Sequence, residues 1–185
     1  LVHHASNGRS VYSFCMCPGG TVVAATSEVG RVVTNGMSQY SRNERNANAG
    51  MVVAIDPPDY PLETTAWQAA FGEEEGAQLA REAVALSRQT PSETHPLAGI
   101  VLQRQLESLA FEVGGRNYEA PGQLVGDFLA QRPSTIWGSV QASYKPGVKL
   151  GDLADVLPHY AIDAMREALP VFGRKIKGYD MADAV

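Results

Sequence analysis

The first third of the chain alternates apolar and polar positions, and this pattern predicts β-strands. The clearest strand covers residues 11–17, where Tyr12, Phe14 and Met16 lie on one side that we assign to the core. The Pro-Gly-Gly sequence at 18–20 predicts a turn, because proline lacks an amide donor and glycine tolerates positive φ. Further strands are expected at residues 21–26, 31–34 and 51–55.

The rest of the chain has the apolar spacing of helices. The strongest prediction is a helix over residues 97–113, with an apolar stripe that includes Leu102 and Leu109 and a Gly-Gly stop at 114–115. Pro170 is expected to kink or end the last helix. The other elements predicted are helices over residues 73–86, 121–131, 153–157 and from 158 onward, and a short strand near 137–142.

Strands followed by helices indicate an α+β fold, in which an antiparallel β meander precedes a helical segment. We expect a β part at residues 1–58 and a mainly helical part at residues 59–185. Within the β part, residues 35–49 have no periodicity and contain four asparagines. A loop of this length in a compact domain is usually functional or disordered, so it is a candidate for a site.

The composition allows a hydrophobic core, with 44% hydrophobic and 19% charged residues. The net charge of −5 argues against a nucleic-acid partner. Residues 61–114 carry eight acids and three bases, which predicts an acidic helical face. The longest uncharged stretch, residues 10–27, is interrupted by Pro-Gly-Gly, which argues against a membrane span. Two cysteines and no signal peptide indicate the cytoplasm.

Cys15 and Cys17 are the main candidates for chemistry. On a strand their Cα atoms lie about 6.5–7 Å apart, at the upper limit for a disulfide. They are interpreted either as small buried residues or as redox-active or substrate-facing thiols. No metal site is expected, because two cysteines are too few for four ligands. Arg42 either pairs locally with Glu44 or binds a carboxylate or phosphate group.

The common glycine-rich nucleotide motifs, G-x-G-x-x-G and G-x-x-x-x-G-K-[ST], are absent from the chain. The residues by themselves therefore predict no self-sufficient cofactor cradle, and no catalytic residue is assigned. The chain begins without Met and stops inside what reads as a continuing segment, so we expect a fragment of a longer protein.

Five stretches, in order along nearly the whole chain, resemble a bacterial family of uncharacterised FAD-dependent dehydrogenases, also described as NAD/FAD-utilizing dehydrogenases. The most specific stretch is Val-Tyr-Ser-Phe-Cys-Met-Cys-Pro-Gly-Gly at 11–20. The other four are Thr-Asn-Gly-Met-Ser at 34–38 with Arg42 and Ala47-Asn48 following, Pro-Leu-Ala-Gly-Ile at 96–100, Gly-Gly-Arg-Asn-Tyr-Glu-Ala-Pro-Gly-Gln at 114–123 and Ser-Tyr-Lys-Pro-Gly at 143–147.

The resemblance implies that residues 1–185 are an inserted cap or substrate domain of a larger flavoprotein, inactive alone. It implies FAD as the cofactor, held by a missing FAD-binding part of the same chain, and an unknown small-molecule substrate. Residues 61–94 look like an expanded segment without an assigned role. The resemblance and the turn chemistry place toward the flavin or substrate Cys15, Cys17, Pro18, Gly19, Gly20, Asn35, Gly36, Met37, Ser38 and Arg42.

Two other functions stay open. The chain could be a stand-alone binding or interaction module that uses its acidic helical face. It could also be a thiol-based redox domain that uses Cys15 and Cys17.

Overall fold

The computed structural model describes residues 1–185 and confirms a mixed α+β fold. The chain divides into two compact units. The sheet unit contains residues 1–54 and 109–185, and the helical unit contains residues 55–108. These units do not follow the boundary between strands and helices at residue 58, because the chain returns to the sheet unit after residue 108.

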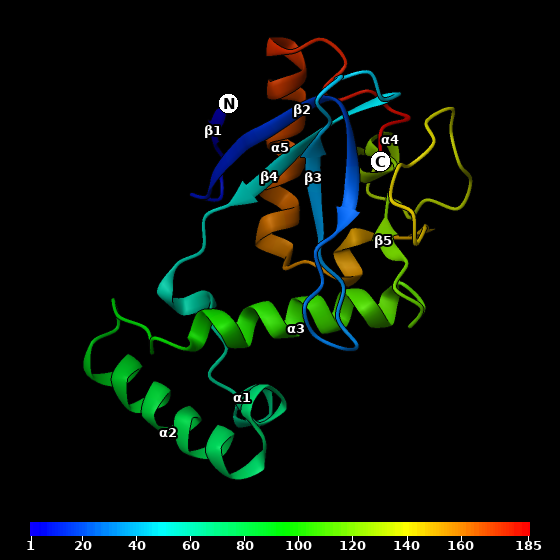
Figure 1. Cartoon of the computed structure of the whole chain (residues 1–185). Helices are drawn as coiled ribbons and strands as arrows, with labels where there is room; N and C mark the ends of the chain where they lie inside the picture. Colours follow the sequence, from blue (N-terminus) through cyan, green and yellow to red (C-terminus); the bar gives the residue numbers. More distant parts are fainter. The chain divides into compact units, whose positions relative to one another are not determined.

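The sheet unit is built around a four-stranded antiparallel sheet (Figure 1). The central strand is β2, which pairs with each of the other three. A parallel pair of short strands, β5 and β6, lies outside this sheet. The elements of the unit are β1 (Val2–His4), β2 (Ser10–Ala24), β3 (Thr34–Ser38), β4 (Asn46–Val53), β5 (Ala120–Gly122), α4 (Val125–Leu129), β6 (Val148–Leu150), a 3-10 turn (Leu153–Asp155) and α5 (His159–Lys175).

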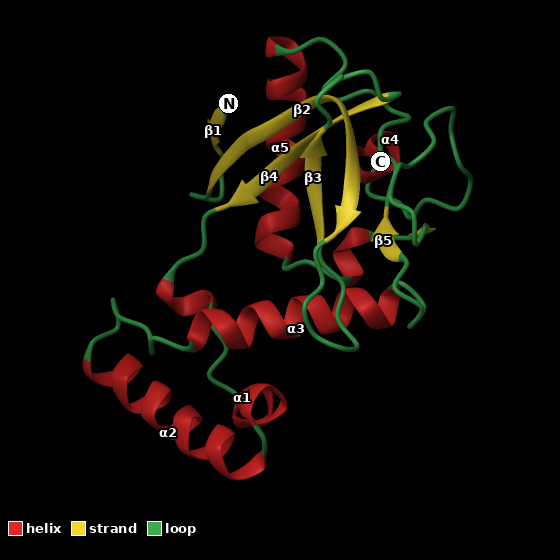
Figure 2. Ribbon diagram, viewed as in Figure 1, coloured by secondary structure: helices red, strands yellow, loops and turns green.

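Helix α5 covers one face of the sheet, as Figure 2 shows. Its predicted apolar face is confirmed, because Ala161, Ala168, Leu169 and Phe172 are buried. Small alanines let the helix approach the strands closely, and Phe172 packs with Val11 in the same core cluster.

The side of β2 that faces this core was predicted wrongly. Val11 and Ser13 are buried beneath α5, whereas Tyr12 and Phe14 are exposed on the opposite face. Met16 is exposed as well, but it follows the register shift after Phe14 and does not continue the face of Tyr12 and Phe14. The predicted alternation holds from Val11 to Phe14 and breaks at the register shift that follows, and periodicity alone does not say which face a helix covers. The buried Ser13 hydroxyl is hydrogen-bonded to the Tyr179 hydroxyl, which satisfies both groups.

Several predicted boundaries are also wrong. Residues 18–20 do not form a turn between strands, because β2 runs through them as one strand. Residues 121–131 form β5 and the short α4, since pairing with β6 keeps Ala120–Gly122 extended. No strand forms at residues 137–142. Pro170 does not end α5, which continues to Lys175 with Phe172 anchored in the core.

The helical unit contains a 3-10 turn (Pro57–Asp59), α1 (Thr64–Phe71), α2 (Glu73–Gln89) and the first part of α3 (Ala98–Val113). The predictions of α2 and α3 are confirmed, and α1 is an additional helix. Within α3 the buried positions include Ala98, Val101 and Ala110, while Leu109 of the predicted stripe is exposed. The core of this unit surrounds Trp67, whose ring is fully buried and whose indole N–H donates to the Pro61 carbonyl at 2.8 Å.

Candidate functional site

The middle of β2 is irregular, and most predicted site residues gather there. The pairing of β2 with β4 shifts register twice, between Phe14 and Cys17 and between Cys17 and Gly20. Cys15 and Gly19 have left-handed backbone, with φ of 50° and 54°. Such bulges bend a strand and often lie next to functional sites. The Pro-Gly-Gly sequence therefore shapes a bulged strand rather than a hairpin.

The loop after β3 packs directly on this bulge. The position of a Cβ on Gly19 lies 2.0 Å from the Arg42 carbonyl oxygen, so only glycine fits there. The Glu44 amide donates to the Gly19 carbonyl at 3.3 Å, and the Arg42 amide donates to the Gln39 carbonyl at 3.1 Å. The long predicted loop is shorter than expected, because β3 and β4 extend into it and leave only residues 39–45 between them.

Two more glycines allow β3 and β4 to approach β2. A Cβ on Gly20 would lie 2.3 Å from the Met37 carbonyl oxygen, and one on Gly36 would lie 2.1 Å from the Asn48 side-chain oxygen. The Asn48 amide also donates to the Thr21 carbonyl at 3.4 Å. The space above these three glycines is filled by the protein itself, so their backbones do not form an open cradle for the phosphates of FAD.

The two cysteines differ in environment. Cys15 is exposed, and Cys17 is buried. Both are free thiols, and the Cys17 Sγ donates to the Cys15 carbonyl at 3.4 Å. The bulge therefore presents one thiol to solvent and keeps the other inside the sheet unit.

The remaining predicted site residues lie on the outside of the same region. Pro18, Asn35, Met37 and Ser38 are exposed, and so is Arg42. Register places Ser38 opposite Gly20 and Met37 opposite Thr21. The structure thus brings Ser38 and Arg42 to the bulge, whereas Asn35 lies opposite Val23, three residues beyond Gly20.

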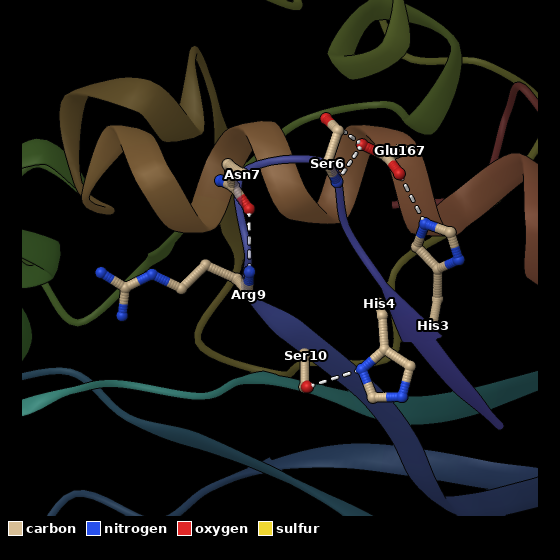
Figure 3. A network of polar contacts seen from close by, with 7 residues as sticks. All are labelled: His3, His4, Ser6, Asn7, Arg9, Ser10 and Glu167. Atoms are coloured by element: carbon tan, nitrogen blue, oxygen red, sulfur yellow. Dashed lines mark hydrogen bonds and ion pairs between the residues drawn. The ribbon is translucent and has the colours of Figure 1, made fainter.

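A second polar cluster, which sequence reasoning missed, joins β1 and the loop after it to α5 (Figure 3). The His3 Nε2 lies 2.8 Å from the Glu167 Oε1, and the Ser6 amide and hydroxyl both donate to Oε2, at 2.9 and 2.7 Å. The hydrogen bonds from Ser6 and then His3 lower the pKa of Glu167 to about 2. Ser6 bonds the carboxylate rather than the imidazole, so the group is not arranged as a catalytic triad. No local pattern could reveal it, because Glu167 is distant in sequence.

The helical unit has a shallow cleft of its own. His95 stacks edge-on against Trp67, with ring centroids 5.1 Å apart, and its Nδ1 accepts from the Leu97 amide at 3.2 Å. The acids Glu73 to Glu75 occupy the first turn of α2, where the helix dipole favours negative charge. The cleft is lined mainly by Pro57, Pro58, Tyr60, Leu62, Pro91 and His95.

Two wider features bear on the class of protein. None of the helices has both the length and the apolar composition that crossing a membrane requires. No group of three His, Cys, Asp or Glu side chains lies in a position to hold a metal ion.

Comparison with known protein families shows the class to which the chain belongs. Residues 1–93 and 77–185 match the family model described as FAD-dependent protein, C-terminal domain-like. The chain belongs to this family, and the predicted resemblance to FAD-dependent proteins is confirmed at that level.

A relative shows how the chain compares with a longer protein. An uncharacterized protein of Clostridium beijerinckii (strain ATCC 51743 / NCIMB 8052) is 43% identical to it over 177 residues. The matched region covers 96% of the chain but only 27% of that protein. The chain therefore spans about a quarter of the length of this relative.

Proposed function

We propose that the chain is the cap domain of an FAD-dependent dehydrogenase, covering the flavin and shaping the pocket for a small-molecule substrate. Two observations support the proposal. Predicted site residues lie along the bulge of β2 and in the segment that packs on it, and the chain belongs to an FAD-dependent family. The partner is the FAD-binding part of the same polypeptide. The two free thiols support a reducing compartment such as the cytoplasm.

In this proposal the glycines of the bulge have a packing role, and the exposed side chains have a ligand-facing role. Gly19, Gly20 and Gly36 permit close backbone packing and fix the shape of the surface. The exposed side chains of Cys15 and Arg42 are free to face a ligand. A guanidinium binds carboxylate or phosphate oxygens well, so Arg42 would orient an anionic group of the substrate or cofactor.

The bound flavin would supply the hydride chemistry, while this domain orients the substrate and excludes water. The interaction-module alternative is weaker, because its acidic helix start is explained by the dipole of α2. The dithiol alternative is weaker as well, since Cys17 is buried and only Cys15 is exposed.

Energy transfer in the full-length, FAD-loaded protein tests the proposal. A fluorophore is attached to Cys15, and its quenching by the flavin is compared with that of the same fluorophore at residue 29 in a Cys15→Ser, Val29→Cys variant. Val29 is exposed in the same unit, beyond the end of β2. At about 3.3 Å per residue, the part of β2 from Cys15 to its last residue, Ala24, spans at most about 30 Å.

Stronger quenching at Cys15 that disappears when FAD is removed is the expected result. Equal or weaker quenching at Cys15 would show that the bulge does not face the flavin and would reject the proposal.

A further inference from the structure

The segment between α4 and β6 presents two large apolar side chains to solvent. Ile136 is 78% exposed and Trp137 is 43% exposed, and their neighbours Thr135 and Gly138 are exposed as well. We call residues 135–138 the apolar tip. Figure 1 shows the segment that carries it, in yellow, extending away from the strands. Single exposed apolar residues are common, so exposure alone assigns no role to the tip.

The tip is fixed to the sheet unit on its N-terminal side by Ser134, which is only 2% exposed. The Ser134 hydroxyl donates to the Asp127 Oδ2 at 2.7 Å and accepts from the Leu124 amide at 2.8 Å. The Ser134 amide donates to the Gly151 carbonyl at 3.0 Å. The chain therefore enters the tip from a buried residue whose hydroxyl and amide are both hydrogen-bonded.

The tip is fixed on its C-terminal side by Ser139. The Ser139 amide and hydroxyl both donate to the Asp183 Oδ2, at 3.0 and 2.7 Å, and these bonds lower the pKa of Asp183. The Arg45 guanidinium donates to the Ser139 carbonyl at 3.2 Å. A Cβ on Gly138 would lie 2.7 Å from the carboxyl carbon of Asp183, so the close packing of the carboxylate requires a glycine there.

These contacts leave four residues between two fixed points. A side chain that is already held in place loses less conformational entropy when it binds than one on a mobile loop. Tryptophan is enriched among the residues that contribute most to binding between proteins, and such residues fill apolar pockets of the partner. An uncharged tip with Ile136 and Trp137, fixed on both sides, has the properties of such an anchor.

We propose that the tip anchors this domain to the FAD-binding part of the same polypeptide, with Ile136 and Trp137 in an apolar pocket of that part, an inference that rests on the proposed function. The length of the relative supports this occupant, because nearly three quarters of that protein lies outside the matched region. The position of the tip supports it too. The Asn46 side chain donates to the Gln141 carbonyl at 2.7 Å, and Asn46 lies opposite Gly20 of the bulge that we direct toward the flavin.

Thiol modification in the full-length, FAD-loaded protein tests the docking of the tip, because the reaction of a thiol depends on its exposure. The probes are Ile136→Cys and, as the matched control, Val29→Cys, each in a Cys15→Ser background. Ile136 and Val29 are 78% and 93% exposed and Cys17 is buried, so both new thiols would react quickly in an uncovered domain. Peptide mass spectrometry gives the two rates, and unfolded protein gives their intrinsic ratio.

We expect the thiol at residue 136 to react on the order of tenfold more slowly than the thiol at residue 29. Adding Trp137→Ala should abolish that protection, because it removes the larger side chain of the anchor. Trp137→Phe, which keeps an aromatic ring, should preserve most of it.

Equally fast reaction of the two thiols with FAD bound would overturn the docking of the tip and leave the proposed function standing. Protection that survives Trp137→Ala would overturn the anchor. Protection that is lost on dilution would assign the tip to a second copy and also overturn the proposal. A full-length protein without FAD would instead overturn the proposed function, and with it the identity of the occupant.

Discussion

Gly19→Ala is the most direct perturbation of the bulge in β2. The new Cβ would meet the Arg42 carbonyl oxygen at 2.0 Å and the carbonyl carbon at 2.4 Å. This backbone cannot move away easily, because the Glu44 and Arg42 amides hydrogen-bond on either side of the contact. Left-handed backbone costs a non-glycine residue about 1–2 kcal/mol. Overpacking adds about 1–3 kcal/mol, so the expected loss of unfolding free energy is about 2–5 kcal/mol.

Urea denaturation of the two glycine variants separates these contributions. Gly30 also has positive φ, 71°, but nothing lies within 4 Å of its Cβ position. Gly30→Ala should therefore cost only the backbone part, about 1–2 kcal/mol. If Gly19→Ala costs no more than Gly30→Ala, the close contact between the bulge and the loop at residues 39–45 is refuted.

Three further predictions concern other contacts. The lowered pKa of Glu167 makes its hydrogen bonds stabilising above the ordinary glutamate pKa of 4.5, and this contribution is lost as the pH falls toward 2. In pH-dependent urea titrations, the stability difference between wild type and Glu167→Gln should therefore shrink across that interval, and a constant difference would contradict the cluster. Ser134→Ala should lower the unfolding free energy by about 1–3 kcal/mol, because the buried Leu124 amide loses its acceptor at 2.8 Å; an unchanged midpoint in the same assay would reject this. Thiol titration of the native protein should modify Cys15 quickly and Cys17 only on unfolding, and two equally fast thiols would disprove the burial of Cys17.

The sequence predicted the elements whose pattern is local and strong. Helices α2 and α3 follow from their apolar spacing, and the α+β class follows from the order of elements. The orientation of β2 was wrong for a physical reason. Tyr12 and Phe14 form the more hydrophobic side of the strand, yet α5 packs on the side of Val11. The alternation of a strand marks its two sides but does not say which of them a helix covers.

The candidate site residues stay a prediction, and their geometry could not be predicted from the sequence. The motif at 11–20 and the segment at 34–42 meet only where Gly20 pairs with Ser38 and where Gly19 packs on the Arg42 carbonyl. The role of Gly19 could not be predicted, because the atom that requires a glycine is the distant Arg42 carbonyl oxygen. The Glu167 cluster was missed for the same reason, since its partners, His3 and Ser6, come from the other end of the chain.

The central claim is that this chain is one domain of an FAD-dependent protein and that the residues that bind the cofactor lie outside it. The flavin content of two purified samples, the full-length protein and the 185-residue chain, tests this claim most directly. We predict one FAD for each full-length molecule, visible in the absorption spectrum, and a colourless 185-residue chain. Stoichiometric, tight FAD binding by the 185 residues alone would contradict the claim.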